Sequence, residues 1–210
     1  MIVLGLTGSI GMGKSTVALM LRRLRVPLFD ADRAVHRMLA AGGSAVGQVE
    51  AAFPGVRTAS GDIDRGLLGQ RVFSDMEALC RLERIVHPLV AAEEKGFLAR
   101  ARARREPIVV LDVPLLFESG TDSRCDYILV VSAPGFIQRQ RVLRRPGTTE
   151  CRLAAILQKQ MPDQAKRRRA DFVVPSSMGR RMTLRHLRVI LRKLRTKTSR
   201  MGRNRRVAHR

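Results

Sequence analysis

The glycine-rich segment from Gly8 to Ser15 constrains the fold more than any other feature of the chain. It reads Gly-Ser-Ile-Gly-Met-Gly-Lys-Ser and matches the pattern G-x-x-x-x-G-K-[ST] at every position. Glycines let a loop bend around phosphate oxygens with its N–H groups turned inward, and the next helix presents its positive N-terminal end to the same anion. An aliphatic run, Ile2 to Leu6, precedes the segment, and apolar residues at helical spacing follow it. The sequence therefore predicts a strand, a phosphate-binding loop and a helix.

This motif also assigns roles to its residues. Lys14 is expected to reach the β- and γ-phosphates of ATP, and the hydroxyl of Ser15 to coordinate the Mg²⁺ that accompanies the nucleotide. The alternative is a glycine-rich turn that binds no nucleotide, but the strand and helix around the motif favour ATP. The expected nucleotide-binding residues of the loop are Gly8, Gly11, Met12, Gly13, Lys14, Ser15 and Thr16.

Strand-like and helical patterns alternate along the chain, which predicts an α/β fold with a mainly parallel sheet flanked by helices. Expected strands cover residues 2–6, 26–29, 108–111, 127–131 and 172–174. We expect one P-loop domain over residues 1–195, with a helical acceptor insertion at about 32–105, broken at His87-Pro88, and a helical lid at about 138–165. After Thr196 the C-terminal helix loses its apolar face, so residues 196–210 are expected to be a disordered basic tail.

Composition narrows the functional classes. Three scattered cysteines form no C-x-x-C pair, which favours a reducing compartment, and no apolar run approaches the roughly 20 residues of a membrane span. We expect a cytoplasmic protein. Its net charge of +22 comes largely from the C-terminal part, where a solvated basic helix is the favoured interpretation. With one Tyr and no Trp for base stacking, nucleic acid is not expected as a partner.

The chain shows no Asn-Lys-x-Asp segment of a guanine-specific GTPase, and it is short for a motor ATPase. A small kinase fits the length. Such an enzyme needs a carboxylate after the second strand, an arginine-rich lid and an acceptor pocket, and candidates for all three are present. Two rivals stay open: a kinase for another small molecule or a nucleoside monophosphate, and a nucleic-acid-binding protein that uses the loop as a switch.

A series of short motifs follows the glycine loop. In order these are Asp30-Ala-Asp32, Asp64-Arg65, Leu82-Glu-Arg-Ile-Val-His87-Pro88, Pro114-Leu-Leu-Phe-Glu118, Gln138-x-x-Arg141-x-x-x-Arg145, Gln160-Met-Pro, Lys166 and Ala170-Asp171. With Gly5 to Thr16 they make the chain, from Ile2 to about Leu194, resemble the dephospho-CoA kinase family. The resemblance implies transfer from Mg²⁺-ATP to the 3′-hydroxyl of the ribose in dephospho-CoA, the last step of coenzyme A synthesis. We expect a monomer.

Asp32 is the candidate catalytic carboxylate, placed to orient and deprotonate the attacking hydroxyl. Its alternative role is to cap the following helix, for which Asp30 competes. Arg141 and Arg145, four apart on one face of a predicted helix, are expected to close over ATP and stabilise charge on the transferred group. The resemblance singles these two out. Spacing alone is equally compatible with a solvated, arginine-rich helix.

Arg65, His87 and Glu118 are the candidates for the acceptor pocket, since dephospho-CoA carries a pyrophosphate. His87 before Pro88 is equally explained as a helix stop, and Glu118 as the partner of a nearby arginine. Asp112, at the end of an aliphatic run, sits where a carboxylate supporting Mg²⁺ would lie. Lys166 and Asp171 are also open to a reading as ordinary surface charges.

The segment Val174-Pro-Ser-Ser-Met-Gly179 departs from the resemblance, which implies a stretch near the adenine that often contains Asn. The sequence therefore assigns no residue to recognition of the base.

Overall fold

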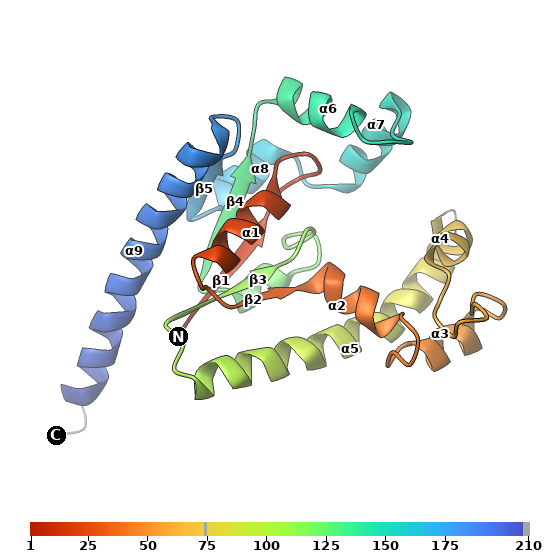
Figure 1. Ribbon diagram of the computed structural model, residues 1–210, viewed down its shortest axis with the longest axis horizontal. Coiled ribbons are helices and arrows are strands. Elements are labelled where there is room, and N and C mark those ends of the chain that lie inside the picture. The colour runs from red at the N-terminus through yellow and green to blue at the C-terminus, as the bar shows by residue number, and fades with distance from the viewer. Residues whose placement is uncertain (74, 208–210) are drawn as a thin grey trace. The chain divides into compact units, whose positions relative to one another are not determined.

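A computed structural model describes residues 1–73 and 75–207, without the side chains of residues 73 and 198–207. The chain divides into two compact units, one formed by residues 1–29 together with those from 101 onward, the other by residues 30–100. The first unit contains the sheet and the second is helical (Figure 1). The bounds of the second unit, residues 30–100, are close to those of the helical insertion expected at about 32–105.

The described residues form a five-stranded sheet in the order β2-β3-β1-β4-β5, which confirms the predicted parallel α/β fold. The strands are β1 Ile2–Thr7, β2 Leu28–Asp30, β3 Ile108–Asp112, β4 Tyr127–Ser132 and β5 Phe172–Pro175. β1 pairs in parallel with β3 on one side and with β4 on the other, and every residue of β1 is buried. Ligands of open parallel sheets bind beyond the carboxyl end of a strand at such a reversal of strand order. The glycine loop lies there.

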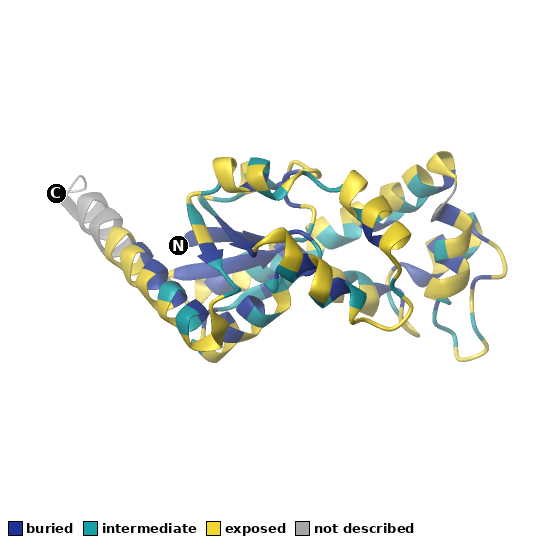
Figure 2. Ribbon diagram, turned by 90° about the horizontal axis from the view of Figure 1, so that it is seen from above, coloured by how far each residue is buried: buried dark blue, intermediate teal, exposed yellow. Residues whose placement is uncertain are grey.

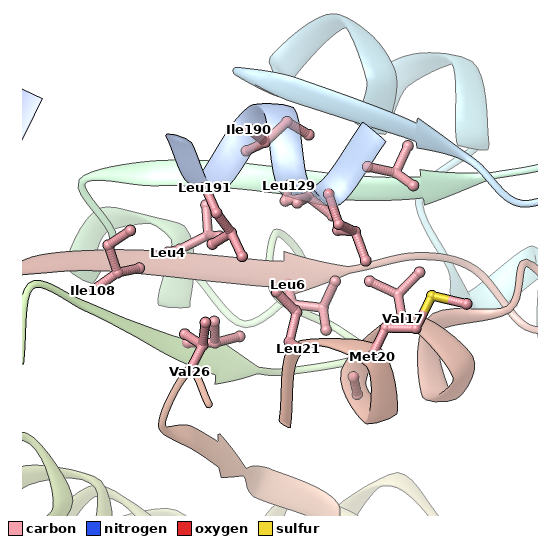
Figure 3. Packing of buried hydrophobic residues seen from close by; sticks show 14 of the residues in the cluster. Leu4, Leu6, Val17, Met20, Leu21, Val26, Ile108, Leu129, Ile190 and Leu191 are labelled. Carbon is pink, nitrogen blue, oxygen red and sulfur yellow. The ribbon is translucent and has the colours of Figure 1, made fainter. Parts of the chain in front are cut away.

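One hydrophobic cluster joins the sheet to α1 (Lys14–Arg23) and α9 (Gly179–Val207). Figure 3 shows Leu4 and Leu6 of β1 between Leu21 of α1 and Leu191 of α9. The apolar residues of α1 recur at helical spacing, which places its buried side against the sheet. This packing fixes the direction in which α1 leaves the glycine loop.

The basic C-terminal helix α9 is longer than the sequence pattern predicts. Its described backbone continues to Val207, whereas a disordered tail was expected from residue 196. Among the side chains that the structure describes, the last buried one on α9 is Leu194. Extending an existing helix adds one hydrogen bond per residue, and Arg, Lys and Met are good helix formers, so no buried face is needed for a few more turns. Along the part of α9 whose side chains are described, buried positions recur every three or four residues, with exposed positions between them (Figure 2). Residues 208–210 of the expected tail lie outside the described residues.

The predicted helical stretch from residue 138 onward consists of separate helices. They are α6 Gly135–Leu143, α7 Glu150–Lys159 and α8 Asp163–Arg169. Pro146 and Pro162 explain the two breaks, because proline disfavours helix in the residue before it. The placement of Arg141 and Arg145 on one helix face was therefore wrong: Arg141 is in α6, and Arg145 lies in the turn before Pro146.

The unit of residues 30–100 contains short helices and one long one. Its helices are α2 Ala31–Met38, α3 Val46–Ala52, α4 Arg65–Phe73 and α5 Met76–Ala103, the last of which continues into the first unit. α5 runs without interruption through Pro88, so the predicted break at His87-Pro88 was wrong. Both residues are exposed. The helical turns on either side of Pro88 therefore hold the helix despite the missing N–H.

Candidate active site

The glycine loop forms a tight turn immediately before α1. Met12 N–H donates to the carbonyl of Ser9 (3.1 Å), and Gly11 and Gly13 adopt left-handed φ values of 75° and 89°. Gly13 is the N-cap of α1 and no side chain caps that end. The first N–H groups of α1 are thus directed to the loop, where they and the helix dipole favour a phosphate.

Close packing explains why three loop positions are glycine. A Cβ on Gly8 would lie 2.7 Å from the carbonyl oxygen of Val131, and one on Gly11 would lie 2.5 Å from a methyl group of Val142. A Cβ on Gly13 would lie 3.1 Å from the hydroxyl of Ser176. The loop is therefore enclosed by β4, α6 and the residue after β5.

Lys14 forms a short ion pair inside this loop. Its Nζ lies 2.6 Å from Oδ1 of Asp112, whose side chain is only 4% exposed. Asp112 ends β3 and is paired in the sheet register with Leu6, just before the loop. The carboxylate thus holds the ammonium at the carboxyl end of β3, beside the loop. Asp112, expected from the sequence to support Mg²⁺, therefore lies next to the glycine loop and in contact with Lys14.

Two hydroxyl residues follow Lys14 in the first turn of α1. Ser15 is exposed and Thr16 is half-buried. Mg²⁺ prefers oxygen ligands and usually binds through one or two protein groups together with nucleotide phosphates. The hydroxyl of Ser15 and the carboxylate of Asp112 are donors of this kind, so the residues present fit a Mg²⁺-nucleotide.

Arg141 is half-buried and contacts both the glycine loop and the residue that follows β5. Its guanidinium donates to the hydroxyl and to the carbonyl of Ser176 (2.8 Å each) and, more weakly, to the carbonyl of Gly11 (3.4 Å). Ser176 in turn donates its hydroxyl to the carbonyl of Met12 (2.6 Å). Arg145 is exposed and is not part of this group.

Glu118 has a different neighbourhood from the one expected for an acceptor-binding residue. Its Oε1 lies 2.9 Å from Nζ of Lys166 and accepts from Met161 N–H at 2.8 Å. Burial acts to raise the pKa of Glu118, but the hydrogen bonds from Lys166 and Met161 outweigh it and hold the pKa below its usual value of 4.5. Lys166 is fully buried, so its reading as a surface charge was wrong. The partner of Glu118 is a lysine, not the arginine considered as its alternative.

The remaining candidates belong to the unit of residues 30–100. Asp30 accepts from Arg33 N–H (3.0 Å) and is the N-cap of α2, so Asp32 in the first turn keeps an exposed carboxylate. Arg65, at the start of α4, lies 2.6 Å from Nε2 of His36 through its Nη1. His87 is exposed on α5.

Sequence reasoning gave no role to Gln138, Gln160 or Ser176, although all three contact the loop. The two glutamines were visible only as parts of the resemblance, and an amide side chain in a helix carries no signal for a distant backbone partner. Ser176 lies in the segment that departs from the resemblance.

A glycine loop with a partly buried Lys–Asp pair, at the strand-order reversal of a parallel sheet, defines a P-loop phosphotransferase. The family model described as dephospho-CoA kinase matches residues 2–180. The chain therefore belongs to the dephospho-CoA kinase family, as predicted from the motifs. It is accordingly an ATP-dependent enzyme of the last step of coenzyme A synthesis.

Individual relatives agree. The dephospho-CoA kinase of Paramagnetospirillum magneticum is 62% identical over 165 residues, covering 79% of this chain and 77% of that protein. That of Rhodospirillum rubrum is 53% identical over 204 residues, covering 97% of both. The crystal structure of TT1252 from Thermus thermophilus matches with a TM-score of 0.80 and 36% identity, covering 92% of this chain and 97% of that one. In the described part of the chain, no helix has the length and apolar character needed to cross a membrane.

Proposed function

We propose that the chain transfers the γ-phosphoryl group of ATP to the 3′-hydroxyl of dephospho-CoA, giving coenzyme A and ADP. The observation that carries this proposal is the Lys14–Asp112 pair at the N-terminus of α1, where no side chain caps the helix. On binding ATP, Lys14 exchanges its carboxylate for the β- and γ-phosphates and neutralises charge that grows as the bridging P–O bond breaks.

Asp32 is proposed as the group that prepares the acceptor. Since Asp30 already caps α2, the carboxylate of Asp32 is free of that duty and exposed. The attacking hydroxyl gives its proton to this carboxylate as its oxygen bonds to the γ-phosphorus, and the oxygen of ADP leaves with the electron pair of the broken bond.

Mg²⁺ is proposed as the cofactor, held with ATP by Ser15 and supported by Asp112. When bound, the ion draws charge from the phosphate oxygens and so favours the leaving of ADP. Arg141, fixed by Ser176 against the loop, adds a second positive group to the nucleotide side of the site. Arg145, which is exposed, is also proposed to contact the nucleotide.

The unit of residues 30–100 is proposed to bind dephospho-CoA. Arg65 and His87 supply exposed groups able to pair with the pyrophosphate of the acceptor. Glu118 is assigned a supporting role, because its carboxylate is already engaged by Lys166 and Met161. Cytoplasmic location and a monomeric state stay predictions of the sequence.

An acceptor panel tests the proposal. ADP release is measured with dephospho-CoA, nucleosides, shikimate and gluconate, for the native protein and for Asp32→Asn. We expect turnover with dephospho-CoA alone, and a loss of about 10²- to 10⁴-fold in the variant with ATP affinity unchanged, because the change removes a proton acceptor and no phosphate contact. Turnover with another acceptor and none with dephospho-CoA would discard the substrate assignment. Near-native turnover of the variant would move the catalytic role away from Asp32.

A further inference from the structure

Ile10, at the tip of the glycine loop, is held by two glutamine side chains. Its backbone N–H donates to Oε1 of Gln160 at 3.0 Å, and its carbonyl oxygen accepts from Nε2 of Gln138 at 2.8 Å. One amide accepts and the other donates, so both backbone groups of this residue are satisfied by side chains more than a hundred residues away in sequence.

The two glutamines come from the two ends of one helical segment, the α6–α7 hairpin, which with its C-cap covers residues 135–160. Gln138 is in the first turn of α6 and is only 8% exposed, whereas Gln160 is the C-cap of α7 and half-buried. Within the hairpin, Arg139 Nε donates to Glu150 at 3.0 Å, which ties α6 to α7. Both ends of the hairpin are therefore attached to the same loop residue.

The attachment through Gln160 is itself supported. The next residue, Met161, donates its N–H to Glu118, and Glu118 is paired with the fully buried Lys166. This chain of contacts connects the end of α7 to the segment after β3 and to α8. Gln160 is thus presented to Ile10 by a fixed backbone and not by a free chain.

We infer that Gln138 and Gln160 are positioning residues that fix the tip of the glycine loop for ATP and couple the α6–α7 hairpin to nucleotide binding. The inference rests on the proposed ATP site. Loop N–H groups stabilise a phosphate most when their directions are set before it binds, because no reorganisation is then needed. Neither glutamine needs to touch the nucleotide. Their effect is expected in the affinity for ATP and not in the affinity for the acceptor.

Methionine variants test each hydrogen bond while keeping the side-chain volume. For Gln138→Met and Gln160→Met we expect the KM and Kd for ATP to rise about two- to tenfold each, the range for one lost hydrogen bond. The KM for dephospho-CoA should stay within twofold. Gln140→Met, exposed on α6, and Gln164→Met, exposed on α8, are matched controls expected to leave all constants unchanged. Unchanged ATP affinity in both test variants would overturn the inference.

Proline at residue 10 isolates the contact with Gln160. Ile10 is the second residue of the turn closed between Ser9 and Met12, and Gly11, with positive φ, is the third. This is a type II turn, whose second position accepts proline, so Ile10→Pro removes the donor without opposing the turn. It should weaken ATP binding as Gln160→Met does, and the double variant should be no worse than either.

The loss of ATP affinity caused by Gln138→Met should still multiply with the loss caused by Ile10→Pro, because the carbonyl of residue 10, to which Gln138 donates, remains. Multiplied losses for Ile10→Pro with Gln160→Met would overturn the pairing. ATP affinity is read by calorimetry, so the result is independent of the acceptor assignment: a native protein that binds ATP but does not turn over dephospho-CoA would refute the proposed function and leave this test intact. The thermal midpoint of each variant checks that it folds.

Discussion

Lys166 is fully buried although Arg167, Arg168 and Arg169 beside it are exposed. A buried ammonium is costly unless a counter-charge meets it, and Glu118 supplies that charge at 2.9 Å. A local run of basic residues gives no indication of which side chain is buried. Lys166 is the buried one because its partner is Glu118, 48 residues earlier in the chain. The same limit hid the contacts of Gln138 and Gln160.

Glu118→Gln should be strongly destabilising because it leaves Lys166 buried without a counter-charge. We expect a loss of about 3 kcal/mol in the free energy of unfolding, the lower end for a broken buried pair, since Glu118 keeps some exposure. Glu83→Gln, at an exposed position of α5, is the matched control and should change the free energy by less than about 0.5 kcal/mol. Urea unfolding at neutral pH measures both, and equal effects would refute the pairing.

The pH dependence of that difference follows from the pKa of Glu118. Burial raises this pKa, but the hydrogen bonds from Lys166 and Met161 together lower it by more than burial raises it, so the pKa in the folded state lies below 4.5. The stabilisation is therefore complete above about pH 4.5 and is lost as the pH falls through the folded pKa. The native protein and Glu118→Gln should converge in stability there. The measurement extends to pH 3, about one pH unit or more below the usual pKa of a glutamate. If the difference in stability between the native protein and Glu118→Gln stayed constant down to that pH, it would contradict the lowered pKa.

At the scale of elements, the strands and the loop were predictable because their signals are local. Ile108–Leu111 is a continuous aliphatic run, and the glycine loop carries its own turn chemistry. The boundaries of the helices were less predictable. Pro146 ended α6 as proline commonly does, whereas Pro88 was absorbed into α5. The two prolines differ in what surrounds them: many helical residues flank the exposed Pro88 on both sides, whereas Pro146 lies in a short connection between α6 and α7.

Pro88→Ala should stabilise α5. Proline costs a helix interior about 3 kcal/mol relative to alanine, and Pro88 is exposed, so we expect a gain of about 1–3 kcal/mol. The new N–H can bond to the carbonyl of Arg84. Gly96→Ala in the same helix is a comparison variant expected to gain less, about 0.5–1 kcal/mol. Because the chain has two units, amide hydrogen exchange along α5 measures the effect better than a global midpoint. Slower exchange for Gly96→Ala alone would show that Pro88 already occupies a helix break.

At the scale of the whole molecule, charge and fold are separable. The net charge of +22 is concentrated towards α9, whose apolar residues nevertheless belong to the main core. The helix is held to the sheet as far as Lys197, which donates to the hydroxyl of Tyr127 on β4 and lies 4.6 Å from the centre of its ring. Residues up to this point therefore support the sheet that carries the glycine loop.

Removal of residues 198–210 separates the kinase from the nucleic-acid alternative. The cut leaves Lys197 in place, and with it Leu194, the last residue that is buried among the described side chains, so the described core keeps its packing. We expect kcat and the KM for ATP to stay within about twofold, because the phosphate site rests on groups between Gly8 and Ser176. A protein that used this basic segment to bind RNA would lose affinity on truncation, and its binding would weaken steeply with salt. Turnover and RNA binding by the full-length and shortened chains, at low and at physiological salt, decide between them. Loss of turnover together with RNA binding would mean that the basic helix takes part in the reaction.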